Sequence, residues 1–203
     1  MPSYFKEWPK TTLTSSVYMA ILLLLFVMRQ DFPLFLIWLH TPIYFLHEFE
    51  EYILPGGFLA FFNTKVLGSK NPEIPLDVRR SFWINVPLVF VAYPLSAILA
   101  TRFGLAWGIW TAYFSVANAL SHVVMYFQQR YNPGLIVSLL VNIPIGVFTI
   151  WYFVSRHLIS VQAHVIGLLI GLGAQAALMI YGFGILKPSI PISLRVRACG
   201  DHR

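Results

Sequence analysis

Long apolar segments alternate with short polar stretches along the whole chain. Six such segments lie at about residues 13–28, 33–53, 82–100, 104–127, 135–154 and 164–186. Each approaches the roughly 20 mostly apolar residues that a helix needs to cross a bilayer. Helices that face lipid must be apolar all round, as these are over most of their length. The sequence therefore predicts an all-α fold, a polytopic transmembrane helix bundle of about six spans.

The composition supports a hydrocarbon solvent. Of the 203 residues, 58% are hydrophobic and only 11% are charged, whereas a soluble domain carries about a quarter charged residues. Too few charges remain to cover an aqueous surface. We expect the lipid bilayer of a plasma or inner membrane to surround a single six-helix domain at residues 1–187. A basic tail at 188–203 should be poorly ordered.

The basic residues predict the orientation. Six spans place both termini, the second loop and the fourth loop on one side, and the opposite side carries only Arg29, Arg102 and Arg156. The positive-inside rule then makes both termini cytoplasmic. The formal charge of +6 is explained by topology, and without a basic run interleaved with aromatics we expect no nucleic-acid partner. The predicted cytoplasmic side holds eleven basic residues: Lys6, Lys10, Lys65, Lys70, Arg79, Arg80, Arg130, Lys187, Arg195, Arg197 and Arg203.

Acidic residues gather near the end of the second segment. His47, Glu50 and Glu51 share one helical face, at positions i, i+3 and i+4. Glu48 lies at the edge of that arc, and we expect it to face cytoplasmic water. Ionisable groups inside a membrane are costly, so their default interpretation is functional. His40, one heptad earlier, fits a structural role near the kink expected at Pro42.

A stripe of small and polar residues follows the fourth segment and should face a neighbouring helix. Its later members, Asn118 and His122, lie near the predicted cytoplasmic end. At about 1.5 Å rise per residue, His47 and His122 are each roughly 8–9 Å inside that end, so the two can meet. The same spacing in the sixth segment, at His164, Gly167, Gly171 and Gln175, predicts helix contact. The full stripe is Gly104, Gly108, Thr111, Ser115, Asn118 and His122.

Two connections complete the prediction. After the fourth segment, Pro133 can begin the next helix and Gly134 allows a tight turn. Tyr131 would lie beside the polar cluster or belong to the interfacial aromatics. Loop 54–81 is predicted either to form a short amphipathic helix at the interface or to skim the headgroups. The only cysteine, Cys199, excludes an intrachain disulfide.

These residues form three motifs in order: His47-x-x-Glu50-Glu51, Asn118-x-x-x-His122 and Tyr131-x-Pro133-Gly134. The set resembles the HXXEE family of integral membrane proteins over about residues 40–140. That family usually has a small hydroxyl residue where this chain has Asn132. The resemblance implies a shared membrane core, but it brings no activity with it.

A metal site is the first hypothesis for the cluster. Two imidazoles with a carboxylate are a common ligand set for zinc or mononuclear iron. His47, Glu51 and His122 would be ligands, and Glu50 a ligand or general base. Asn118 would orient a ligand from behind, with Tyr131 nearby. A di-iron centre fits poorly because one helix supplies all the acids, and the zinc-protease pattern fails because residue 51 is Glu.

Three further interpretations remain open. Glu50 or Glu51 could act as a general acid with a histidine as base, on a lipophilic small molecule. A proton-coupled transporter or binding protein is the alternative, although no internal repeat is evident. The cluster could also be a structural polar network without catalysis. No phosphate loop, nucleophile elbow or nicotinamide fingerprint occurs, so no nucleotide cofactor is indicated.

Overall fold

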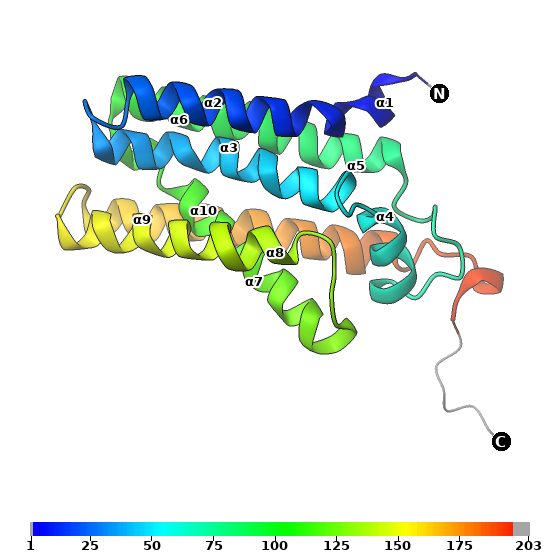
Figure 1. The fold of residues 1–203 in the computed structure, drawn as a ribbon. Helices are drawn as coiled ribbons and strands as arrows, with labels where there is room; N and C mark the ends of the chain where they lie inside the picture. Colours follow the sequence, from blue (N-terminus) through cyan, green and yellow to red (C-terminus); the bar gives the residue numbers. More distant parts are fainter. Residues whose placement is uncertain (1, 197–203) are drawn as a thin grey trace.

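The computed structural model describes residues 2–196, and these residues form an all-helical bundle of six long rods (Figure 1). In the described range, β pairing is limited to one isolated bridge between Ser69 and Arg195. The rods are α1–η1–α2 (Tyr4–Glu7, Trp8–Thr11, Thr12–Phe26), α3 (Phe32–Tyr52), α5–η3–α6 (Val78–Asn85, Val86–Ala92, Tyr93–Phe103), α7 (Trp110–Gln129), α8–η5–α9 (Leu135–Val137, Ser138–Asn142, Ile143–Ser155) and α10–η6 (Val161–Ile180, Tyr181–Leu186).

Each rod corresponds to one predicted segment, so the predicted helices are confirmed. The first rod begins nine residues earlier than predicted, at Tyr4, and the fourth begins six residues later than predicted. Gly104 has a φ of 108°, a backbone conformation that glycine adopts without strain, and it is followed by the short turn η4 (Leu105–Trp107). The helix α7 therefore begins only at Trp110, and two members of the predicted stripe, Gly104 and Gly108, lie before it.

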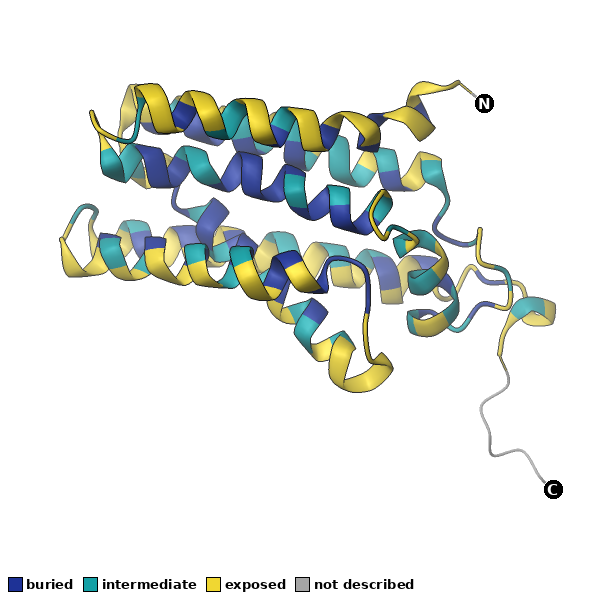
Figure 2. Cartoon of the chain, viewed as in Figure 1, coloured by how far each residue is buried: buried dark blue, intermediate teal, exposed yellow. Residues whose placement is uncertain are grey.

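Four of the six rods are long and apolar enough to cross a membrane: Tyr4–Phe26, Val78–Phe103, Leu135–Ser155 and Val161–Leu186. Their outer faces expose apolar side chains such as Leu25 and Leu169 (Figure 2). The other two rods, α3 and α7, have 21 and 20 residues and carry the polar cluster. Six membrane crossings and the cytoplasmic termini stay predictions, although both ends of the described chain lie at the same end of the bundle (Figure 1).

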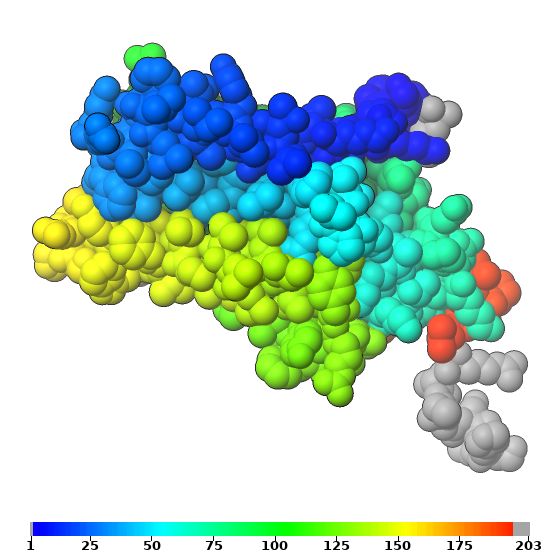
Figure 3. Space-filling model, in the orientation of Figure 1, coloured from blue at the N-terminus to red at the C-terminus, as the bar shows by residue number. Residues whose placement is uncertain are grey.

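Helices α7 and α10 pack closely at their N-terminal halves and then separate. A Cβ added at Gly167 would lie 2.6 Å from Ile109 Cγ2, and one added at Gly171 would lie 2.7 Å from the backbone nitrogen of Phe114. Only glycine permits this approach, which confirms the predicted close contact. Beyond it, α7 diverges from α10 (Figure 1), and its end projects from the bundle (Figure 3).

The loop after α3 is folded and pinned by a buried amide. It forms the short helix of the two predicted alternatives, α4 (Phe58–Phe61) continued by η2 (Phe62–Val66). The Asn63 side chain donates to the carbonyls of Pro72 (2.8 Å) and Leu76 (2.9 Å) and accepts from the Leu76 backbone N–H (2.8 Å). These bonds join the two halves of the loop to each other.

The first part of the tail is also folded, unlike the poorly ordered segment we predicted. The backbone N–H of Val196 donates to the Gly68 carbonyl at 2.9 Å, and that of Lys70 donates to the Leu194 carbonyl at 2.7 Å. Ile190 is buried in a small apolar cluster with residues of the loop. Residues 197–203, with the predicted basic residues Arg197 and Arg203 and with Cys199, lie outside the described residues.

Candidate metal centre

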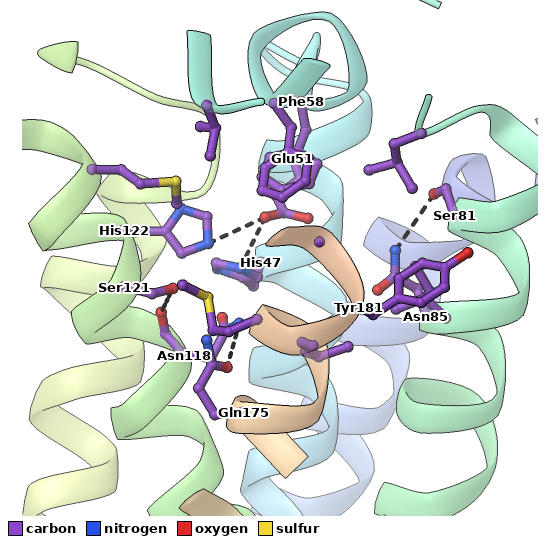
Figure 4. A pocket seen from close by; sticks show the side chains of 18 of the residues that line it. His47, Glu51, Phe58, Ser81, Asn85, Asn118, Ser121, His122, Gln175 and Tyr181 are labelled. Carbon is purple, nitrogen blue, oxygen red and sulfur yellow. Dashed lines mark hydrogen bonds and ion pairs between the residues drawn. The ribbon is translucent and has the colours of Figure 1, made fainter. Parts of the chain in front are cut away.

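A compact group of three side chains lies near the ends of α3 and α7 (Figure 4). His47 and Glu51 are one turn apart on α3, with 3.5 Å between His47 Nε2 and Glu51 Oε1. His122 comes from α7, and its Nε2 lies 3.2 Å from the same oxygen. The two imidazole centroids are 4.8 Å apart, and all three side chains are buried. The predicted meeting of the two helices at this depth is confirmed.

The turn after α7 fixes the orientation of His122. Arg130 and Gly134 both have left-handed backbone angles, with φ of 67° and 95°, so the chain reverses and brings Asn132 over the imidazole. The Asn132 Nδ2 group donates to the His122 carbonyl at 3.0 Å. A carbonyl can only accept, so the amide oxygen of Asn132 must face His122 Nδ1, at 2.7 Å.

This contact decides where the neutral imidazole carries its hydrogen. Because the Asn132 oxygen can only accept, His122 Nδ1 must be the donor, and Nε2 of the neutral ring is left with a lone pair. That lone pair faces Glu51 Oε1 at 3.2 Å in a buried setting. Two acceptors do not approach in this way without a cation between or beside them. A proton or a metal ion is therefore required at the contact.

The spacing of the three groups suits a metal ion. One donor atom from each of His47, Glu51 and His122 lies within 4.8 Å of the others. Tetrahedral zinc with bonds of about 2.0–2.1 Å places its ligand atoms about 3.3 Å apart. The two measured separations from Glu51 Oε1, 3.2 and 3.5 Å, bracket that value. Three protein ligands leave a fourth position open, as in catalytic zinc sites.

Glu50 is turned away from this group, although the sequence placed it on the same face. Its Oε1 accepts from the Ile136 backbone N–H at 3.0 Å, and its Oε2 accepts from that of Val137 at 2.7 Å. The Tyr131 hydroxyl also donates to Oε1, at 3.3 Å. Consecutive helical residues differ by 100°, so Glu51 faces the imidazoles while Glu50 faces the start of α8. The structure does not bring Glu50 or Tyr131 to the histidine pair.

Two further side chains differ from the prediction. Glu48 is buried, with 1% of its surface exposed, and its Oε2 has no hydrogen-bond partner. The expectation that Glu48 faces water is therefore wrong; the wall of a cavity beside the centre includes it. Asn118 does not bond to a histidine: its Nδ2 donates to Gln175 Oε1 of α10 at 3.3 Å (Figure 4). The orienting position that sequence assigned to Asn118 is occupied by Asn132.

Sequence reasoning missed how closely the chain packs on the imidazoles. A Cβ at Gly134 would lie 2.6 Å from His122 Cε1 and 2.9 Å from His47 Cε1, so glycine is needed for space as well as for its φ. Phe58 of α4 covers the centre from the loop side, with its ring centroid 6.1 Å from that of His122. The aromatic run in loop 54–81 was the available signal, but nothing in the sequence says where it folds.

The remaining core histidines have separate partners. His40 Nε2 contacts the Thr149 hydroxyl at 3.3 Å, and His164 Nδ1 contacts that of Tyr113 at 2.9 Å. Both contacts join neighbouring helices, which agrees with the structural roles predicted for these two residues. In the described part of the chain, His47 and His122 are thus the histidines that share a carboxylate.

Comparison with known families places these residues in a recognised group. The family model described as "Protein of unknown function with HXXEE motif" matches residues 38–149, more than half of the chain. This chain is a member of the HXXEE family. The matched region includes all three motifs, most of α3 and the whole of α7, so the resemblance predicted from the motifs is confirmed. Neither curated proteins nor solved structures gave a match to this HXXEE protein.

Proposed function

We propose that this HXXEE protein is a multi-pass membrane enzyme that binds a divalent metal, zinc or iron, at His47, Glu51 and His122. The observation that carries the proposal is the 3.2 Å approach of two acceptors, His122 Nε2 and Glu51 Oε1, in a buried site. A metal ion satisfies both groups at once. Asn132 acts behind His122 in the way that carboxylates and carbonyls commonly support metal-bound histidines.

The centre is suited to a lipophilic small molecule because it opens onto a largely apolar cavity. A metal bound there would polarise an oxygen of the substrate or activate a water molecule. The protein would hold the His122 imidazole in one tautomer through Asn132 and exclude bulk water with Phe58 of the covering loop. If a proton fills the contact in place of a metal, the same pair becomes a general acid and base, which is the second candidate.

Metal content tests this proposal directly. We expect near-stoichiometric zinc or iron by elemental analysis of the purified protein, lost in His47→Ala and in His122→Ala. His164→Ala is the matched control, because it removes a core imidazole that bonds to Tyr113 and not to the centre. Retention of metal in both site variants, or no uptake by the wild type when zinc and ferrous iron are each supplied, would overturn the metal proposal. The second outcome would favour the acid–base candidate.

We also propose that the chain crosses the plasma or inner membrane six times, with both termini in the cytoplasm. Four apolar rods support this, together with the distribution of basic residues, eleven against three. Reporter domains fused to either end should both be active only as cytoplasmic reporters. A periplasmic or extracellular signal from one end alone would require an odd number of crossings.

A further inference from the structure

The cavity beside the centre is small and has the three candidate ligands in its wall. Its volume is about 320 Å³, near the lower limit of the roughly 300–1,000 Å³ typical of small-molecule sites. His47, Glu51 and His122 lie together in this wall (Figure 4), and apolar side chains such as Phe58 and Leu178 supply much of the remaining surface. A ligand there would present a polar group to the centre and apolar surface to the walls.

The mouth of the cavity lies in the gap between α7 and α10–η6. The two helices are joined at Asn118 and Gln175 and separate beyond that point (Figure 1). Val124 of α7 and Met179 and Phe183 of α10–η6 both line the cavity and reach the outer surface, with 54%, 41% and 38% of each residue exposed. The polar Gln128 of α7 is the fourth exposed residue of the lining. Because the other three are apolar, the rim is favourable in contact with hydrocarbon and unfavourable in water. The mouth therefore opens sideways, toward lipid.

The charges of the lining favour an uncharged ligand. The acidic side chains of the lining are Glu48 and Glu51, and among the residues that the structure describes no Lys or Arg contributes to it. A divalent cation would at most neutralise the two carboxyl groups, so a carboxylate or phosphate would find no net positive partner. Asn118 Oδ1 is buried without a partner and can accept a hydrogen bond from a hydroxyl.

We propose that the substrate is a single-chain amphiphile with an uncharged oxygen-bearing head, of the long-chain alcohol class, that enters sideways between α7 and α10. This inference rests on the proposed function, since it assigns the substrate of the same site. At about 320 Å³, the cavity is near the lower limit for small-molecule sites. It therefore accepts the head and the first part of one chain, while the rest of the chain passes Val124 and Met179 into the bilayer.

Photolabelling tests this proposal with two probes that differ only in the head. The probes are hexadecan-1-ol and hexadecanoic acid, each with a mid-chain diazirine, added to the protein in bilayer nanodiscs. We expect the alcohol to label the cavity peptides of α7 and η6, and the acid to label them about tenfold less. Val124→Trp should reduce alcohol labelling about tenfold by filling the mouth. Leu120→Trp is the control, because Leu120 is 49% exposed on the same helix and does not line the cavity.

The outcomes separate this inference from the metal proposal. Equal labelling by the acid, or labelling spread evenly over exposed apolar residues of α2 and α9, would overturn the substrate class. Metal retained in the same samples would then show that only the substrate assignment had failed. Conversely, cavity labelling that Val124→Trp blocks, in protein without any metal, would support the lateral site and remove the metal from it.

Discussion

Replacing Asn132 by Leu tests the central argument, because the orientation of His122 depends on that amide. Asn132→Leu keeps a similar volume but removes the acceptor at His122 Nδ1 (2.7 Å) and the donor to the His122 carbonyl (3.0 Å). The imidazole can then rotate or change tautomer. Nε2 no longer presents a fixed lone pair toward Glu51, so the metal affinity should fall.

The magnitude follows from comparable outer groups at metal sites. Loss of such a partner typically weakens metal affinity 10- to 100-fold, a free-energy change of ~1.4–2.7 kcal/mol. Asn132 is fully buried, so the change also leaves the His122 Nδ1–H without a partner in an apolar site. That should lower the free energy of unfolding by about 1–3 kcal/mol.

Competition against a chelator of known zinc affinity measures the first effect, and thermal unfolding in detergent measures the second. Asn118→Leu is the matched control, because it removes an amide that bonds to Gln175 and not to a histidine. We expect its metal affinity to equal that of the wild type. Asn132→Asp retains the acceptor at His122 Nδ1 and should bind zinc more tightly than Asn132→Leu. Wild-type zinc affinity in Asn132→Leu would refute the tautomer argument.

Three further predictions concern the surroundings of the centre. Gly134→Ala should lose metal and unfold at a lower temperature, because its Cβ would lie 2.6 Å from His122 Cε1 at a φ of 95°; elemental analysis and thermal unfolding measure this, and a fully loaded variant would contradict the packing. Glu50→Gln should keep the metal but lose about 1–3 kcal/mol of stability, since an amide group would face the Val137 backbone N–H; metal loss without destabilisation would place Glu50 in the centre instead. Burial and the Glu50 carboxylate raise the pKa of Tyr131 from 10.0 to about 12, so its stabilisation is complete below pH 10 and is lost as the pH rises through about 12. Comparing the tyrosinate absorbance of the wild type with Tyr131→Phe measures this, and a transition near pH 10 would contradict it.

The sequence was sufficient for the helices and for the meeting of α3 and α7. The apolar segments predicted the rods because the hydrophobic signal of each extends over many residues. His47, Glu51 and His122 were predicted to meet because helical rise converts residue number into depth. Both inferences use regular geometry, which sequence spacing carries directly.

The parts that could not be predicted depend on irregular backbone and on neighbours distant in sequence. Asn132 was seen only as a departure from the family pattern, because its role arises from the left-handed turn at Arg130 and Gly134. Glu48 was expected in water because no sequence pattern shows that residues of the loop and of α5 line a cavity around it. The four-residue spacing of His47 and Glu51 was visible, but the partner of Glu50 in α8 lies 86 or 87 residues away.

The double attachment of α3 has a consequence for how the protein can move. Glu50 and Glu51 are neighbours in sequence but contact different parts of the molecule. Glu50 accepts hydrogen bonds from the backbone at the start of α8, and Glu51 contacts the imidazole pair. Rotation of α3 about its axis would break both sets of contacts at once, so we expect this wall of the cavity to be rigid. We expect any movement that admits a ligand to occur on the opposite side of the cavity, where α7 and α10 are in contact at their N-terminal halves and separate beyond Asn118 and Gln175.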